Sequence, residues 1–129
     1  MKYLMFLIVL ILTSCGGDFP RSPSQSWKDL SFSVESRPPE IKPGMIEFLL
    51  VADRGERKRA HDLLVSIRMG EMGAWTQSIQ DGNTGVYRRA IRVTDPASDV
   101  LNVYIKYKES ETVLKFPLSS FVVAQKDSR

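Results

Sequence analysis

Apolar and polar residues alternate along several short segments of the chain. In the first, at 30–34, Leu30, Phe32 and Val34 alternate with polar residues. Similar segments follow at 45–52, 61–69, 75–80, 86–93, 100–107 and 112–118. A period of two is typical of strands that turn one face toward a core, and no segment keeps a helical period. The pattern therefore predicts about seven strands.

The connections between these segments favour an all-β fold. Residues 37–44 are rich in proline, 81–85 reads Asp-Gly-Asn-Thr-Gly, and 108–111 separates the last two strands. Such residues form turns and interrupt both helices and central strands. Short strands at a spacing of about ten residues are typical of β-sandwiches. We predict one β-sandwich domain at residues 27–124, followed by a frayed tail at 125–129.

The first fourteen residues follow a different pattern. Lys2 supplies a positive charge, and residues 3–12 are almost entirely apolar. This run is only about half of the roughly 20 residues that a membrane-spanning helix needs, and its length is typical of a secretory signal peptide. We therefore predict a cleaved signal peptide at 1–14.

The end of this segment, Leu12-Thr13-Ser14-Cys15, resembles the lipobox of bacterial lipoproteins. The resemblance implies that Cys15 becomes the first residue of the mature chain and carries a lipid such as palmitate. In enterobacterial lipoproteins an aspartate after the cysteine commonly marks retention in the inner membrane, and Gly16 stands there in this chain. The resemblance thus implies the outer membrane, facing the periplasm, with the inner membrane as the alternative. Residues 15–26 are rich in Gly, Pro and Ser and predict a flexible lipidated tether.

Composition excludes several kinds of function. The chain has 18 basic and 15 acidic residues, a net charge of +3, which does not indicate nucleic-acid binding. A single cysteine cannot form an internal disulfide. The only histidine, His61, begins a predicted strand, which is more typical of a surface residue than of a catalytic base. No phosphate-binding or calcium-binding motif is present, so we predict no catalytic residues and a non-enzymatic protein.

The densest basic run consists of Arg54, Arg57, Lys58 and Arg59. Two interpretations remain open. The run is either a solvated loop between strands, or a contact for anionic lipid headgroups or an acidic partner.

Met69 and Met72 lie three residues apart in a glycine-rich loop. Thioethers are soft ligands that suit Cu(I), and His61 or Met45 would have to supply a third ligand. In the alternative interpretation both methionines fill space in the core, with Met69 ending the inward face of its strand and Met72 covering the core beneath Trp75.

The order of these motifs resembles a known group of periplasmic domains. Pro43-Gly44 precedes a strand, Met69-Gly70-Glu71-Met72-Gly73 follows one, Gly85-Val86-Tyr87 begins another, and a hairpin closes the chain. Over residues 38–118 this resembles the YtkA-like and FixH-like domains, which are similar to CopC-like copper proteins. The resemblance implies an immunoglobulin-like β-sandwich. Members often carry a histidine where Ala74 and Trp75 stand and a Gly-x-Trp where Asp99-Val100-Leu101 stands, and the missing histidine weakens a copper function more than the fold.

The sequence therefore predicts a lipid-anchored, non-enzymatic binding or accessory module of the cell envelope. The membrane is reached through the lipid, and an envelope protein is the expected partner. The alternative is a Cu(I)-handling protein related to cytochrome oxidase assembly or copper homeostasis. Apart from Cu(I) in that alternative, no cofactor is predicted.

Overall fold

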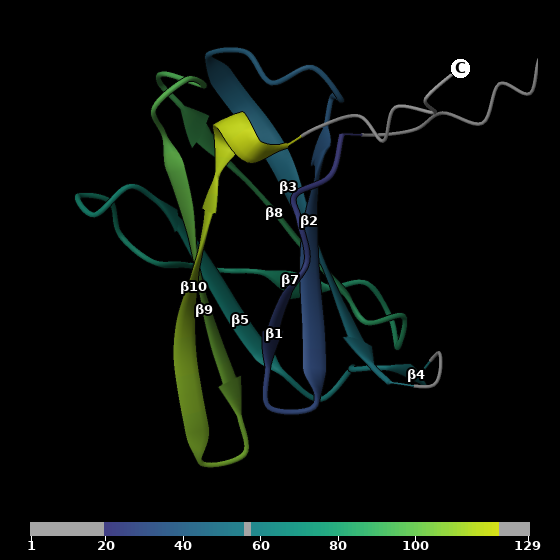
Figure 1. The fold of residues 1–129 in the computed structure, drawn as a ribbon. Helices are drawn as coiled ribbons and strands as arrows, with labels where there is room; N and C mark the ends of the chain where they lie inside the picture. Colours follow the sequence, from purple (N-terminus) through teal and green to yellow (C-terminus); the bar gives the residue numbers. More distant parts are fainter. Residues whose placement is uncertain (1–19, 56–57, 122–129) are drawn as a thin grey trace, which may run out of the picture.

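Two antiparallel sheets make up the part of the chain that the computed structural model describes, residues 20–55 and 58–121 (Figure 1). Its strands are β1 Gln25–Trp27, β2 Leu30–Arg37, β3 Gly44–Arg54, β4 Lys58–Arg59, β5 Leu64–Met69, β6 Thr76–Gln77, β7 Ile79–Gln80, β8 Val86–Val93, β9 Val100–Tyr107 and β10 Ser110–Pro117. A short 3-10 helix, η1, spans Leu118–Ser120. No helix in these ranges is long and apolar enough to cross a bilayer. The predicted all-β sandwich is confirmed. The predictions for the signal peptide, Cys15, Arg57 and the tail lie outside the described residues.

The strand order is that of an immunoglobulin-like sandwich. The larger sheet runs β1-β2-β3-β8-β7, with β4 also paired to β3, and the smaller sheet runs β10-β9-β5-β6. Taken in their order within each sheet, β2-β3-β8-β7 and β10-β9-β5 correspond to strands A-B-E-D and G-F-C of a constant-type immunoglobulin domain. β6 extends the smaller sheet beyond β5.

The predicted inward faces form the core between the sheets. Leu30, Phe32 and Val34 of β2 are almost completely buried, as are inward residues of the other long strands: Ile46, Phe48, Leu50, Val65, Ile67, Tyr87, Val93, Leu101, Val103, Ile105 and Phe116. β3 differs because it is central, with β2 and β8 on its two sides. Its outward Leu49 and Val51 are therefore buried as well, and this strand reads as a continuous apolar run.

The segment at 75–80 forms two short strands instead of the one predicted. β6 pairs with β5 in the smaller sheet, whereas β7 pairs with β8 in the larger sheet. Ser78 lies between them, is buried, and donates its N–H to the Val65 carbonyl at 2.8 Å. The chain therefore crosses from one sheet to the other here, a change that alternation alone does not reveal.

The tether predicted at 15–26 is wrong for residues 21–26. Arg21 pairs with Glu35 through a backbone bridge and an ion pair. Ser22 is buried, and its hydroxyl accepts the Val34 N–H at 2.8 Å. β1 then pairs with the start of β2. Order here comes from hydrogen bonds to the edge of β2, which a prediction based on apolar content does not detect.

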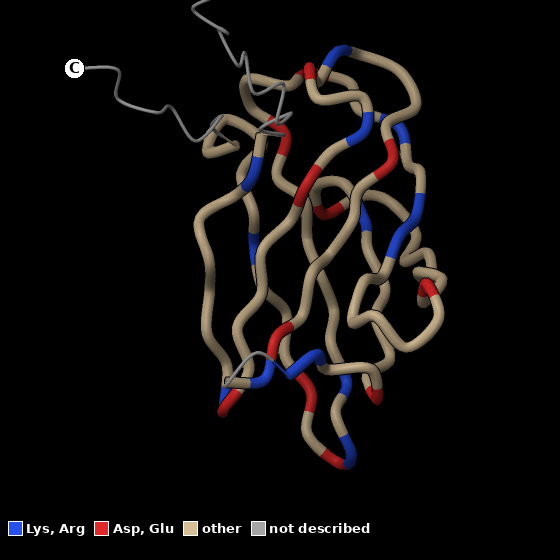
Figure 2. The backbone as a smooth tube through the Cα atoms, turned by 90° about the vertical axis from the view of Figure 1, so that its right-hand side faces the viewer, with Lys and Arg blue, Asp and Glu red and all other residues tan. Residues whose placement is uncertain are grey.

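The two ends of the sandwich differ. The described chain enters near Pro20 and leaves through η1 at the same end (Figure 1). The β9–β10 turn and the β3–β4 connection lie at the opposite end, where basic and acidic positions gather together (Figure 2). Any anchor preceding Pro20 therefore attaches to the end away from the basic run.

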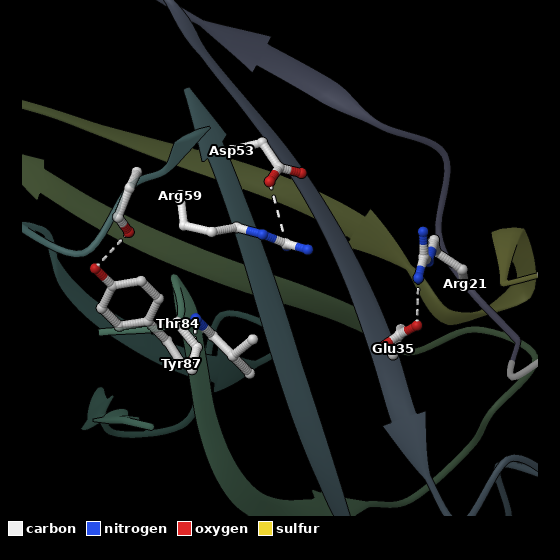
Figure 3. A network of polar contacts seen from close by, with 8 residues as sticks. Arg21, Glu35, Asp53, Arg59, Thr84 and Tyr87 are labelled. Atoms are coloured by element: carbon white, nitrogen blue, oxygen red, sulfur yellow. Dashed lines mark hydrogen bonds and ion pairs between the residues drawn. The ribbon is translucent and has the colours of Figure 1, made fainter. Parts of the chain in front are cut away.

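Tyr87 of β8 binds the segment between β4 and β5 through its hydroxyl group. The side chain is 2% exposed. Its hydroxyl donates to the Ala60 carbonyl at 2.9 Å (Figure 3) and accepts the Leu63 N–H at 3.1 Å. Burial raises the pKa of this hydroxyl above its ordinary 10.0, while the bond from Leu63 acts in the opposite direction. The hydroxyl therefore holds the chain that leads into β5.

We expect Tyr87→Phe to lower the free energy of unfolding by about 1–3 kcal/mol, because it leaves a buried N–H and a buried carbonyl without a partner. Folding raises the pKa of Tyr87 above 10.0. The stability that its protonated hydroxyl contributes is therefore complete below pH 10.0, and it is lost as the pH rises through the higher pKa of the folded state. Urea unfolding between pH 7 and 11 measures both effects. Tyr107→Phe, at a half-buried tyrosine, is the control. Equal losses for the two variants would contradict this role.

Candidate functional site

Three side chains stack on the outer face of the smaller sheet. The Arg68 guanidinium lies 4.4 Å from the centre of the Trp75 ring, and the Trp75 and Tyr104 ring centres are 6.0 Å apart. Arg68 of β5 and Tyr104 of β9 point outward because their neighbours in both strands fill the core. Trp75 is 39% exposed, and Leu64 and Val113 are exposed on the same face. We call Arg68, Trp75 and Tyr104 the stacked triad.

A hydrogen bond orients Tyr104 of the triad, whereas one donor of Arg68 has no acceptor in the described ranges. The Tyr104 hydroxyl donates to the Glu111 carboxylate, and this bond raises the pKa of Tyr104. The tyrosine therefore stays protonated and oriented at neutral pH. The Nε of Arg68 is buried and has no hydrogen-bond partner among the described residues. Within that part of the chain, this donor therefore lacks the acceptor that a buried polar group usually has.

A hollow of about 450 Å³ lies beside the triad, between the β5–β6 edge and the end of β8. We call it the inner hollow. The carboxylate of Asp99 on its wall already accepts the N–H groups of Thr94 and Asp95, at 2.9 and 3.0 Å. Arg68 and Arg92 border the hollow, Arg92 from the outer face of the larger sheet, and their positive charge favours a carboxylate or another anion there. Its lining residues are Arg68, Met69, Gly73, Ala74, Thr76, Ile91, Arg92, Thr94 and Asp99.

The structure does not bring the predicted copper ligands together. Met69 is half-buried, packs against the core and lines the inner hollow. Met72 is 98% exposed, so the prediction that it covers the core beneath Trp75 is wrong. His61 is exposed and precedes the start of β5, whereas Met69 ends that strand. At about 3.3 Å per residue, β5 alone separates them by roughly 17 Å.

The other possible donors do not complete a metal site. Met45 lies on the outer face of the larger sheet, opposite Arg92 in β8. In the described ranges, no three His, Cys, Asp or Glu side chains lie close enough together to hold a metal ion. Neither His61 nor Met45 is therefore placed to act as a third ligand beside Met69 and Met72.

We expect Met69→Leu to cost less than about 1.5 kcal/mol of unfolding free energy, because the swap nearly conserves volume. Met72→Leu should change stability by less than about 0.5 kcal/mol, since its side chain contacts solvent. Neither variant should change Cu(I) affinity in a competition titration against a Cu(I) chelator. Tight binding of one Cu(I) per chain that is lost in the double variant would instead establish the copper function.

The basic run is largely paired within the protein. Arg54 bonds to Asp62 at 3.0 Å and lies over the Tyr107 ring. Arg59 pairs with Asp53 at 3.2 Å (Figure 3). Lys58 is exposed, and Arg57 lies outside the described residues. Local carboxylates thus offset two of the three described charges, which favours the solvated loop over an anionic contact.

The sequence prediction missed the stacked triad and the arginines of β8, Arg88, Arg89 and Arg92. The sequence offered two signals for these residues. One was a tryptophan in a glycine-rich loop, and the other was the order Arg-Arg-Ala-Ile-Arg in one strand. No protein family, curated protein or solved structure matches the chain. The resemblance to YtkA-like and FixH-like domains therefore stays a prediction that rests on its short motifs.

Proposed function

We propose that the chain is a lipid-anchored, non-enzymatic binding module of the cell envelope that holds a partner protein through the stacked triad. The lipobox at Leu12–Cys15 supports the anchor, and the outer membrane facing the periplasm is the proposed location. The single observation that carries the binding function is the exposed Trp75 ring, in contact with Arg68 and Tyr104.

The residue types of the triad and their fixed orientation favour protein binding. Trp, Tyr and Arg are the residues that most often dominate the energy of protein interfaces. Trp75 contacts both the Tyr104 ring and the Arg68 guanidinium, and Glu111 orients Tyr104. Side chains that are already fixed lose less conformational entropy on binding. Leu64 and Val113 add exposed apolar surface around the triad.

The proposed anchor would place the triad and the inner hollow toward the membrane. The inner hollow includes Met69, Thr94 and Asp99, which lie at the end of the sandwich where the chain enters. The basic run lies at the other end and begins with Arg54, the last of the 11 residues of β3, which span about 36 Å. This placement supports a membrane-associated protein as the partner of the triad and does not favour headgroup binding by the basic run.

The proposal is tested by co-purification from detergent-solubilised membranes of cells that produce the full chain. We expect the partner to be retained by the wild type and by Ser26→Ala, which changes an exposed side chain of β1 at the far edge of the larger sheet. Once the partner is known, Trp75→Ala should weaken its binding by roughly 30-fold, as for an interface residue worth about 2 kcal/mol. Equal binding by Trp75→Ala and Ser26→Ala would refute the proposal.

A further inference from the structure

We propose that the edge of β8 binds an acidic, extended segment of the partner, which adds as a strand to the larger sheet. This inference rests on the proposed function, because it names the chemistry of the partner next to the stacked triad. Three independent features of β8 support it: its backbone, the hollows beside it and its charges.

The backbone of β8 has unpaired groups on one side. β8 pairs with β3 over Val86–Val93, but β7 covers it only at Tyr87 and Arg88. The Val86 carbonyl accepts the Asp81 N–H at 2.8 Å, so even-numbered residues of β8 direct their backbone groups away from β3. Ala90 and Arg92 therefore present N–H and C=O groups outward, with no partner in the described ranges, and both residues are exposed. Such an edge is a template for another strand.

Two hollows lie on opposite faces of this edge. The inner hollow is bordered by Ile91 and Arg92 and faces the smaller sheet. A second hollow of about 360 Å³, the outer hollow, is lined by Glu47, Ile79, Arg88, Arg89 and Ala90. Glu47 and Arg88 point away from the core. Side chains of a strand alternate between its two faces, so successive side chains of an added strand would enter the two hollows in turn.

The charges at this edge select an acidic segment. Arg88 has acidic neighbours, Glu47 at 4.0 Å and Asp81 at 3.9 Å. Arg89 and Arg92 form no ion pair with any described residue, and neither does Arg68, which borders the inner hollow. Carboxylates of an added strand would satisfy these groups. A second copy of β8 would instead set arginines against arginines, which disfavours self-association.

The probe is a fluorescent eight-residue peptide of alternating Glu and Val, titrated against the full chain in detergent. We expect saturable binding, with binding at least about tenfold weaker for the Lys-Val peptide, because its charge is repelled. Ala90→Pro should weaken binding to a similar extent, since it removes an outward N–H while proline is tolerated at strand edges. Arg92→Glu should do the same. Lys106→Glu, a charge change on the smaller sheet, should leave binding unchanged.

The variants separate this inference from the proposed function. Circular dichroism checks that Ala90→Pro is folded, and Arg92→Glu tests the same edge without a proline. If both variants bind the peptide as the wild type does, strand addition is overturned, while loss of the partner in Trp75→Ala still supports the proposed function. Dimers of the full chain that disappear in Ala90→Pro would show that a second copy occupies the edge and would also overturn the inference. So would binding to phosphatidylglycerol vesicles without binding to the peptide.

Discussion

Cys15→Ser is expected to release the protein from membranes and to abolish its labelling by radioactive palmitate. The cysteine is the only sulfhydryl of the chain and ends the lipobox, so serine leaves no thiol for the lipid. Each buried methylene of a lipid chain contributes about 0.8 kcal/mol to membrane binding, and losing the chains should move the protein into the soluble fraction.

Membrane fractionation and palmitate labelling measure the two effects together. Ser14→Ala is the matched control, because it keeps a small residue before the cysteine and should remain labelled. Palmitate labelling that survives in Cys15→Ser would end the lipoprotein interpretation.

Gly85→Ala is expected to cause one of the largest losses of stability among single substitutions. Gly85 has a φ of +75°, and an added Cβ would lie 2.8 Å from both the Ala52 carbonyl oxygen and the Arg59 Cβ. The Ala52 N–H also donates to the Gly85 carbonyl at 2.9 Å, so the two backbones cannot separate without breaking this bond. A positive φ alone costs an L residue about 1–2 kcal/mol, and we expect a total loss above about 4 kcal/mol with the clash.

Gly82→Ala separates the clash from the backbone strain. Gly82 has a φ of +59° and no atom within 4 Å of an added Cβ, so only the cost of positive φ applies, about 1–2 kcal/mol. Urea unfolding of both variants measures the difference. Equal losses at the two positions would contradict the close packing of the β8 start against β3 and β4.

Strand positions could be predicted wherever one face of a strand is buried. β8 was predicted with its observed bounds because Tyr87, Ile91 and Val93 alternate with arginines. The prediction failed where other forces decide the structure. β1 is held by hydrogen bonds to β2, and the chain changes sheets at Ser78 without any change in alternation.

The candidate site was less predictable because it joins residues from separate strands. Arg68, Trp75 and Tyr104 meet only after β5 and β9 pair in register. The residues of the predicted copper set lie apart for the opposite reason. His61 and Met69 are close in sequence, but an extended strand keeps its two ends apart. A short separation in sequence therefore does not bring two side chains together when the residues between them form an extended strand such as β5.

In-cell photocrosslinking tests the binding function most directly. A benzoylphenylalanine at Gln77, an exposed residue of β6 near the triad, is compared with one at Ser26, an exposed residue of β1 at the far edge of the larger sheet. The account predicts one discrete crosslinked partner from Gln77, none from Ser26, and loss of the Gln77 product when Trp75→Ala is added. A Gln77 product that persists in Trp75→Ala, or equal products from both positions, would contradict it.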